Sequence, residues 1–343
     1  MNTKDAKYTQ FALCREMMDV VGVAKTFDPA RTAKVARALA RTRRLMLTGE
    51  GSSRIFPAKN ARRKALAWGL DLQVVTDGSR QAATYDLSKF ATFLASNSGR
   101  TQEVVVLAKA LQAAGRKHVY GLTANAGTIL EASTTSTFVL TCGWEQAVAA
   151  TKSVAEQAMI YQSIISHIAG RDMAADMKGL DRKLAKALAV EIPGAIVRKA
   201  AAAGTIYFAG YNDGVAEELT LKTNEITRKR SDFLEGTYAV HGIEEIMDRR
   251  DIVFVVDPIR EEVGKFVDVL AKGVGLTVVA IANRPVKGLE TIVVPNAGEM
   301  NPYVFLAAGW NLLVEIGLAL GINLDKAERA RKVGNEFTGK TAK

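Results

Sequence analysis

The chain carries one strand–helix–strand pattern twice, and this duplication constrains its fold more than any other feature. The stretch FLASNSGRTQEVVVLAKALQAAGRKHVYGLTAN in the first half matches VFVVDPIREEVGKFVDVLAKGVGLTVVAIAN in the second. Gly49 precedes Ser96 by 47 residues, and Gly210 precedes Asp257 by the same number. Apolar strands that alternate with helical segments favour parallel sheets covered on both faces. We therefore expect an α/β fold of two tandem, doubly wound, flavodoxin-like parallel-sheet domains.

The 343 residues are enough for two domains of ordinary size. We predict five segments: N-terminal helices over 1–40, a first domain over 41–168, interdomain helices over 169–203, a second domain over 204–325 and a tail over 326–343. We predict a first strand, a glycine-rich turn and a helix over 43–66. Further strands are expected near 70–76, 90–96, 117–125, 135–141, 204–210, 251–257 and 276–283. Between them we predict helices over 101–115, 145–168, 213–227 and 260–273, and Asp28 or Pro29 begins the second N-terminal helix.

Composition narrows the class of protein. Cys14 and Cys142 are the only cysteines and lie far apart, so neither a paired metal site nor a framework of several disulfides is possible, and a reducing cytoplasm is expected. The charged N-terminus does not resemble a signal peptide, and no run of about 18 uncharged apolar residues predicts a membrane span. The formal net charge of +10 suits an anionic partner, which could be a phosphorylated metabolite, a nucleic acid or an acidic membrane.

Two strand-to-helix turns of the first half are rich in glycine and hydroxyl groups. They are GEGSS (49–53), which contains Ser52 and Ser53, and SNSGRT (96–101). Ligands bind beyond the carboxyl ends of parallel strands, and backbone N–H groups at a helix start can hold a phosphate. Helix capping is the alternative, but one cap needs one hydroxyl and SNSGRT offers three: Ser96, Ser98 and Thr101. A dinucleotide fingerprint is not met, because Arg54 stands where its third glycine would be.

The second half carries candidate groups for proton transfer. Glu218 and Glu225 fall on one face of a predicted helix, and His241 precedes a glycine at a turn. A carboxylate and a histidine near a phosphate site suit proton transfer on a sugar. His118 and His167 are interpreted as structural or surface residues.

At this point the ordered motifs resemble a known family. GEGSS, SNSGRT, EQAVAATKSV (145–154), EELTLKTNEIT (217–227) and HGIEEIMD (241–248) are similar, over roughly 40–335, to the double sugar-isomerase-domain (SIS) family. This family includes the isomerase half of glucosamine-fructose-6-phosphate aminotransferase, stand-alone glucosamine-6-phosphate deaminases and fructosamine-phosphate deglycases. The resemblance implies a cytoplasmic homodimer that acts on a phosphorylated sugar without a metal or cofactor.

The resemblance also implies roles for single residues. Ser53, Ser96, Ser98 and Thr101 match the hydroxyls that bind the phosphate, with Asn97 beside them. Val148 matches a residue whose backbone lines the sugar site. Glu225 matches the glutamate that moves a proton between C1 and C2, and His241 matches the histidine that helps to open the sugar ring and reaches the site of the neighbouring subunit. Lys332, in RARKVGNEF (329–337), matches the lysine of the tail that closes the site.

Some residues depart from the family pattern. The second-domain turn reads GYN (210–212) in place of G-R-G, and EGTYAVHG (235–242) differs from the usual G-E-x-x-H-G. At the place equivalent to SNSGRT the second half has DPIREE, whose Asp257 is expected to repel phosphate. No N-terminal cysteine for a glutaminase half is present, so we do not expect a glutamine-dependent synthase.

Three functions remain open from the sequence. The first is a phosphosugar isomerase or amino-sugar-phosphate deaminase, the second is a fructosamine-phosphate deglycase, and the third is a sugar-phosphate-binding regulator that has lost the chemistry. Nucleic-acid binding is not expected, because the basic cluster RKR (228–230) is more typical of a solvated or interface patch and no recognition helix precedes the first strand.

Overall fold

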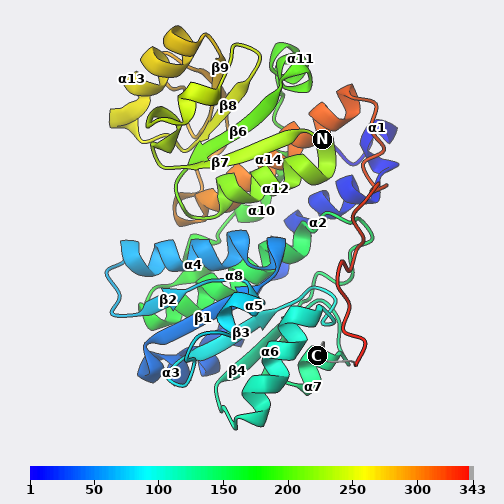
Figure 1. Ribbon diagram of the computed structural model, residues 1–343, viewed down its shortest axis with the longest axis vertical. Coiled ribbons are helices and arrows are strands. Elements are labelled where there is room, and N and C mark those ends of the chain that lie inside the picture. The colour runs from blue at the N-terminus through cyan, green and yellow to red at the C-terminus, as the bar shows by residue number, and fades with distance from the viewer. Residues whose placement is uncertain (340–343) are drawn as a thin grey trace. The chain divides into compact units, whose positions relative to one another are not determined.

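The computed structural model describes residues 1–339 and contains two five-stranded parallel sheets, each flanked by helices (Figure 1). The first sheet has the strand order β2-β1-β3-β4-β5, and the second has the order β7-β6-β8-β9-β10. Counted from the first strand of each sheet, the two orders are the same. The predicted fold of two tandem, doubly wound parallel-sheet domains is therefore confirmed.

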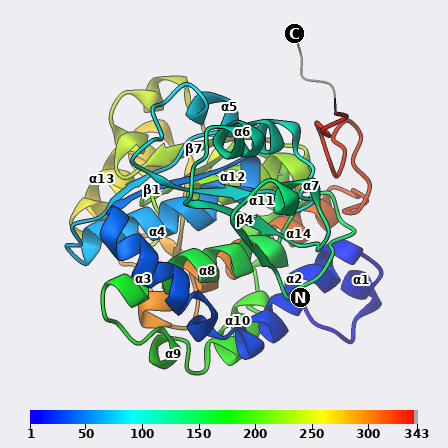
Figure 2. The ribbon, with the colours of Figure 1, turned by 90° about the horizontal axis from the view of Figure 1, so that it is seen from below.

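The first sheet belongs to a compact unit that contains residues 26–146, 150–178 and the tail from 329, here called the first-sheet unit. Its strands are β1 (Arg44–Gly49), β2 (Gln73–Val75), β3 (Ala91–Ala95), β4 (Val119–Thr123) and β5 (Ser136–Val139). Its helices are α3 (Ala33–Thr42), α4 (Ile55–Ala67), α5 (Ser79–Ala82), α6 (Gln102–Ala113), α7 (Ile129–Ala132), α8 (Lys152–Ile168) and α9 (Met173–Asp176). Helix α4 packs along α8 (Figure 2). Every residue of β3 and β4 is buried, as expected for central strands that helices cover on both faces.

The second sheet belongs to a unit that contains residues 1–25, 147–149 and 179–328, here called the second-sheet unit. Its strands are β6 (Thr205–Gly210), β7 (Arg230–Glu235), β8 (Ile252–Val256), β9 (Thr277–Ala282) and β10 (Glu290–Val293). Its helices are α1 (Ala6–Thr9), α2 (Ala12–Thr26), α10 (Leu180–Leu188), α11 (Gly194–Ala202), α12 (Val215–Thr227), α13 (Val263–Lys265), a π-helix (Phe266–Val274) and α14 (Asn301–Ala319). The Asp325 carboxylate caps α2 by accepting hydrogen bonds from the backbone N–H groups of Ala12 and Leu13, at 2.7 and 2.8 Å.

The duplication extends to the backbone contacts of two glycines. In the sheet registers, Gly49 at the end of β1 pairs with Ala95, and Gly210 at the end of β6 pairs with Val256. A Cβ atom on Gly49 would lie 2.7 Å from the carbonyl oxygen of Ala95, and one on Gly210 would lie 2.9 Å from that of Val256. Real Cβ atoms essentially never approach so closely, so both copies need glycine at this place.

Several observed elements differ from the sequence-based expectations. Strand β10 and helix α14 are absent from the predicted elements. The helix predicted over 145–168 begins only at Lys152, because the preceding turn folds around the buried Glu145 carboxylate. Strand β7 was not predicted, since its sequence RSDFLE is mostly polar and only Leu234 is fully buried. The helix predicted over 260–273 is a 3₁₀ turn, one short α-helical segment and the π-helix.

Within residues 1–339, one helical stretch, Gly298–Ala319, has the length and apolar composition to cross a membrane. In this structure 83% of its apolar window is buried inside the protein. The stretch therefore serves as the core helix of the second-sheet unit.

Candidate functional site

The SNSGRT turn leaves the carboxyl end of β3 and places its three hydroxyls in one cluster. The Ser96 hydroxyl lies 2.8 Å from that of Thr101 and 3.5 Å from that of Ser98. Ser98 Oγ accepts a hydrogen bond from the backbone N–H of Arg100, at 3.2 Å. Gly99 has a φ of 65°, and a Cβ there would lie 2.4 Å from that of Thr128, so the turn requires glycine. The sequence therefore brings together the hydroxyls that it predicts for phosphate binding.

The three hydroxyls differ in their access to solvent. Ser96 is 1% exposed, whereas Ser98 and Thr101 are half-buried. In this structure the Ser96 hydroxyl organises the turn through Thr101. Of the three residues, Ser98 also lines the cavity that lies beside the turn.

A buried carboxylate that the sequence analysis missed fixes Asn97 in this turn. The Asn97 side-chain amide donates hydrogen bonds to Glu145, at 2.9 Å, and to the Ser153 hydroxyl, at 3.2 Å. Glu145 has no exposed surface and also accepts hydrogen bonds from the backbone N–H of Thr151, at 2.7 Å, and from the Ser153 hydroxyl. Among residues 1–339, Asn97 Oδ1 finds no hydrogen-bond partner although it is buried. The sequence signal for it is Glu145 at the start of EQAVAATKSV, in a segment for which the pattern predicts a helix.

The GEGSS turn leaves β1, which is hydrogen-bonded to β3, at the same edge of the first sheet. Residues 51–53 form one 3₁₀ turn in which Ser52 is buried and the Ser53 N–H donates to the Glu50 carbonyl, at 3.3 Å. The Glu50 carboxylate accepts a hydrogen bond from the Ser79 N–H, at 2.8 Å, and partial burial raises the pKa of Glu50 above its ordinary value. Glu50 therefore ties the turn to the next loop.

The chain returns to the SNSGRT turn in its tail. The Gln102 N–H donates to the Asn335 carbonyl and the Phe337 N–H donates to the Arg100 carbonyl, both at 2.9 Å. Arg100 also forms an ion pair with Glu336, at 3.2 Å. These contacts lay residues 335–337 along the start of α6.

A cavity of about 380 Å³ lies between the turn and the tail. Ser98, Thr128, Trp144 and Val333 are among its lining residues. The ammonium of Lys332 lies 5.7 Å from the centre of the Trp144 ring, within the range of a cation–π interaction. Residues 340–343, the last part of the predicted tail, lie outside the described residues.

In the second-sheet unit, α12 carries a buried lysine between two glutamates. The Lys222 ammonium lies 2.7 Å from a carboxylate oxygen of Glu225 and 3.3 Å from one of Glu218. Lys222 and Glu218 are fully buried, while the Glu225 side chain keeps 24% exposure. Burial acts to lower the pKa of Lys222, but Glu225 and Glu218 outweigh it and raise this pKa above its ordinary value. The sequence signal for this cluster is the helical Glu-x₃-Lys-x₂-Glu spacing of Glu218, Lys222 and Glu225.

The other predicted residues of the second half have fewer contacts. His241 is exposed on the loop that follows β7, and in the described part of the chain no hydrogen bond or ion pair joins it to Glu225. Val148 is half-buried in segment 147–149, which packs with the second-sheet unit through a hydrogen bond from the Ala147 N–H to Glu16, at 3.2 Å.

The remaining histidines have structural contacts. His118 Nδ1 lies 3.3 Å from the Tyr120 hydroxyl, and His167 Nε2 lies 2.9 Å from the Pro29 carbonyl oxygen. Over residues 1–339, no group of three or more His, Cys, Asp or Glu side chains has an arrangement that could hold a metal ion.

Comparison with known proteins finds the same architecture elsewhere. The chain is 25% identical, over 261 residues, to glutamine–fructose-6-phosphate aminotransferase (isomerizing) of Aeropyrum pernix; the match covers 69% of this chain and 42% of the relative's length. Two solved structures superpose over nearly the whole chain. One is the C-terminal domain of glucosamine-fructose-6-phosphate aminotransferase from Francisella tularensis, with a TM-score of 0.76, 14% identity and coverage of 95% of this chain and 100% of that one.

The second structure is glucosamine-6-phosphate deaminase from Thermotoga maritima, with a TM-score of 0.73, 19% identity and coverage of 96% of this chain and 99% of that one. No family model matches the sequence. The resemblance predicted from the ordered motifs is confirmed at the level of the fold.

Proposed function

We propose, from the premise that this chain has the tandem SIS fold, that the protein is an enzyme that interconverts the aldose and ketose forms of a phosphorylated hexose or hexosamine. The similar proteins named above bear the names of enzymes that act on fructose 6-phosphate or glucosamine 6-phosphate. Because the aligned part of the Aeropyrum relative is less than half of its length, that protein's complete reaction is not carried over.

The observation that carries the proposal is the Lys222–Glu225 ion pair on α12. The Lys222 ammonium lies 2.7 Å from a carboxylate oxygen of Glu225, and a neighbouring cation favours the carboxylate form that a general base needs. Among Glu218, Lys222 and Glu225, only the Glu225 side chain is accessible to solvent. Lys222 is completely buried and holds that carboxylate in a single orientation.

The proposed reaction is balanced without any further reactant. Glu225 removes the proton from C2 of the open-chain aldose phosphate, the C–H electron pair forms the C1–C2 double bond, and the C1–O1 π pair moves to O1, which gives an enediolate. Glu225 then returns the proton to C1 while the O2 proton moves to O1, which yields the ketose. His241 is proposed to assist ring opening, from the neighbouring subunit of a homodimer, as the family resemblance implies.

The phosphate is proposed to bind at the carboxyl edge of the first sheet. The hydroxyls of Ser98 and Thr101 and the backbone at the start of α6 offer hydrogen-bond donors to it. Ser96 and the GEGSS residues Ser52 and Ser53 support the two turns.

The proposed proton transfer is compatible with substrates that carry nitrogen at C2 and with substrates that do not. With a hexosamine phosphate the same proton transfer gives an enolamine, and hydrolysis then releases ammonia and a ketose phosphate. A deglycase would release a free amino acid instead. The name of the Thermotoga structure favours the deaminase among these.

The test is a panel of hexose 6-phosphates, glucosamine 6-phosphate and fructosamine 6-phosphates, with ketose, ammonia and free amino acid measured separately. We expect the Glu225→Gln variant to lose about 10²–10⁴-fold in kcat. Its affinity for the substrate is expected to stay near that of the wild type. The matched control is Glu290→Gln, which changes an exposed carboxylate on β10 and should leave kcat unchanged. Equal turnover by the wild type and Glu225→Gln would contradict the proposal.

A non-catalytic sugar-phosphate-binding protein is the second candidate. Two observations favour it: His241 is exposed, and within residues 1–339 no hydrogen bond or ion pair joins His241 to Glu225. Tight binding of a hexose phosphate without conversion of any substrate in the panel would support this candidate over the enzyme.

A further inference from the structure

A second cavity, which does not belong to the proposed site, lies in the second-sheet unit. It has a volume of about 740 Å³, within the size range of small-molecule sites. It lies where the chain leaves the carboxyl ends of β8 and β9, the place where open α/β sheets bind ligands. The residues that matter for its chemistry are Asp257, Arg260, Asn283, Arg284, Lys287 and Asn301.

This cavity is topologically equivalent to the hydroxyl-rich turn of the first sheet. Strand β8 is the counterpart of β3, so Asp257 and Arg260 stand where the first copy has Ser96 and Gly99. The two cavities are separate sites, because their lining residues belong to different units. Glu225 does not line the cavity of the second-sheet unit. Helix α12 begins near the carboxyl edge of the sheet and runs back toward the opposite edge, and Glu225 lies near its end.

The cavity carries an excess of positive charge. Arg260, Arg284 and Lys287 are exposed, and within residues 1–339 none of the three has an ion pair or a side-chain hydrogen bond. Asp257 is the only acidic residue in the lining, so the formal balance is three positive charges against one negative. Taken alone, Asp257 predicts a place that repels phosphate. With the two loops assembled, the site attracts anions.

Two features of the backbone mark the same place. Asp257 has a φ of 47°, a left-handed conformation that costs free energy in a residue other than glycine. Its N–H donates to the Ile281 carbonyl, at 3.0 Å, which holds the strained residue at the wall of the cavity. The helix that starts at the cavity becomes a π-helix over Phe266–Val274, whereas its counterpart α6 is regular. Strained residues and π-helical turns are concentrated at functional sites.

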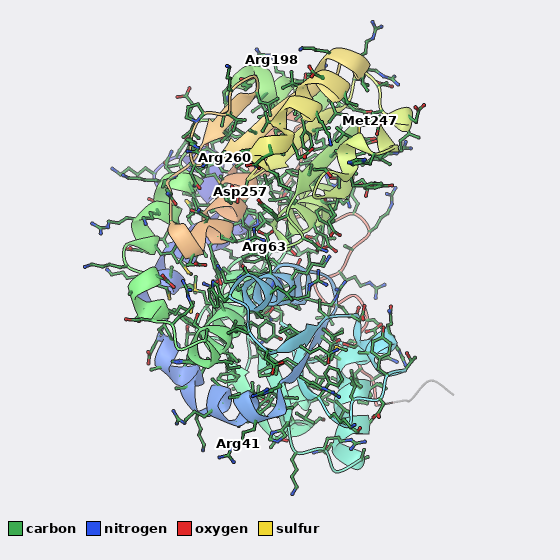
Figure 3. The ribbon with its side chains drawn as sticks, turned by 90° about the vertical axis from the view of Figure 1, so that its left-hand side faces the viewer. Arg41, Arg63, Arg198, Met247, Asp257 and Arg260 are labelled. Carbon is green, nitrogen blue, oxygen red and sulfur yellow. The ribbon has the colours of Figure 1, made fainter. Side chains whose placement is uncertain are left out.

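We propose that this cavity is a binding site for a small metabolite that carries at least two phosphate groups. Three cations on two successive loops exceed what one phosphate needs, and arginine binds phosphate oxygens through two parallel hydrogen bonds. Asn283, whose amide donates to the Pro295 carbonyl at 2.9 Å, and Asn301, whose Oδ1 accepts from the Ala297 N–H at 2.6 Å, also line the cavity. The labelled side chains of Asp257 and Arg260 lie near one another on the second-sheet unit (Figure 3). The site is separate from the proposed catalytic groups and is suited to an effector.

The experiment uses inorganic pyrophosphate as the probe, with orthophosphate as the comparison, in isothermal titration calorimetry at low and moderate salt. A Ser98→Ala/Thr101→Val background removes the hydroxyls of the first-sheet turn, so the result does not depend on the proposed function. In this background we add Arg260→Gln/Arg284→Gln. The matched control adds Arg198→Gln/Arg249→Gln, which removes the same charge from exposed positions of the same unit. Thermal unfolding verifies that each variant folds.

We expect pyrophosphate to bind more tightly than orthophosphate, and the Arg260/Arg284 variant to bind it at least tenfold more weakly than the background. The control should bind within about twofold of the background, because screened charges away from the cavity contribute little. The proposal is overturned by an equal loss in both charge variants, by unchanged binding in the Arg260/Arg284 variant, or by no binding of pyrophosphate at millimolar concentration.

Discussion

The turn after β3 and the turn after β8 occupy the same place in two copies of one fold, yet they differ in chemistry and in surroundings. The first, SNSGRT, is neutral apart from Arg100, and the tail pairs with it through residues 335–337. The second, DPIREE, opens on a larger cavity lined with cations, and no tail pairs with it in the described chain. The backbone framework is shared, including the close approach of a glycine to the neighbouring strand at Gly49 and Gly210.

This difference indicates how the duplicated unit divided its tasks. The strands and the end-of-strand glycines set the geometry of the sheet edge, and they are the same in both copies. The turn residues, which we propose to determine the ligand, differ between the two copies. In the first copy a buried carboxylate, Glu145, fixes Asn97 in the turn, whereas the second copy has Pro258 at the place of Asn97. The proposed base Glu225 lies on a helix of the second copy, and the proposed phosphate grip lies on the first.

The largest expected effect on stability comes from the buried lysine of α12. Lys222→Met would leave Glu218 buried without its cation and Glu225 without its partner. Removal of one member of a buried ion pair costs about 3–5 kcal/mol of the free energy of unfolding. The matched control is Lys272→Met, which removes an exposed ammonium that pairs with Asp268 at the same i,i+4 spacing. It should cost less than about 1 kcal/mol. Urea unfolding at pH 7 measures both, and equal losses would contradict the assigned role of Lys222.

The pH dependence of that effect has a definite sign. Because the folded-state pKa of Lys222 lies above its ordinary value of 10.5, its charge stabilises the fold fully below the unfolded-state pKa. The contribution is lost as the pH rises through the folded-state pKa. We expect the difference in unfolding free energy between the wild type and Lys222→Met to be constant between about pH 7 and pH 9 and to shrink above about pH 10.5. A difference that grows with rising pH would contradict this assignment.

The hydroxyls of the first turn should affect binding more than turnover. Each hydrogen bond to a charged phosphate contributes about 1.5–3 kcal/mol, so the loss of both in Ser98→Ala/Thr101→Val should raise KM for the sugar phosphate by about two to four orders of magnitude. The value of kcat should change little. The control is Ser88→Ala, which removes an exposed hydroxyl from the same unit. Steady-state kinetics on the best substrate of the panel separates the two parameters. A loss confined to kcat would place the phosphate elsewhere.

The paired glycines test whether the two copies share one backbone requirement. Gly49→Ala and Gly210→Ala each place a methyl group against a carbonyl oxygen, and we expect each to cost about 1–3 kcal/mol of unfolding free energy. The control, Gly22→Ala, meets no atom within 4 Å in the interior of α2 and should gain up to about 1 kcal/mol. Chemical denaturation of the three variants measures the effects. If only one of Gly49→Ala and Gly210→Ala is destabilising, the two copies do not share the same backbone requirement at the ends of β1 and β6.

The smallest effect is expected from the tail. Lys332→Ala removes the cation over the Trp144 ring, an interaction of about 0.5–1 kcal/mol at an exposed site. KM should therefore rise only a few-fold if the tail closes the proposed site. Lys326→Ala, an exposed lysine of the second-sheet unit, is the control and should leave KM unchanged. A large loss of kcat in Lys332→Ala would instead assign this lysine to the chemistry.

The sequence allowed most of the fold to be predicted, because apolar runs such as 91–95 and 252–256 are buried central strands. Strand β7 could not be found in this way, since an edge strand needs only one covered face and RSDFLE has few apolar residues. The SNSGRT hydroxyl cluster was predictable because its members are local in sequence. The partners of that turn, Glu145 and residues 335–337, come from distant segments, and only the folded chain brings them to it. The cationic cavity was missed for the same reason: Arg284 and Lys287 lie on a different loop from Asp257.

The central claim is that Glu225 moves a proton between C1 and C2 of a sugar phosphate. The most direct measurement is proton NMR of the best ketose or aldose substrate of the panel in D₂O, with enzyme in catalytic amount. The account predicts that the wild type replaces the C1 proton of the ketose or the C2 proton of the aldose with deuterium, and that Glu225→Gln does so at least about 100-fold more slowly while Glu290→Gln behaves as the wild type. Exchange at the same rate in Glu225→Gln and the wild type, or product formation without Glu225, would contradict it.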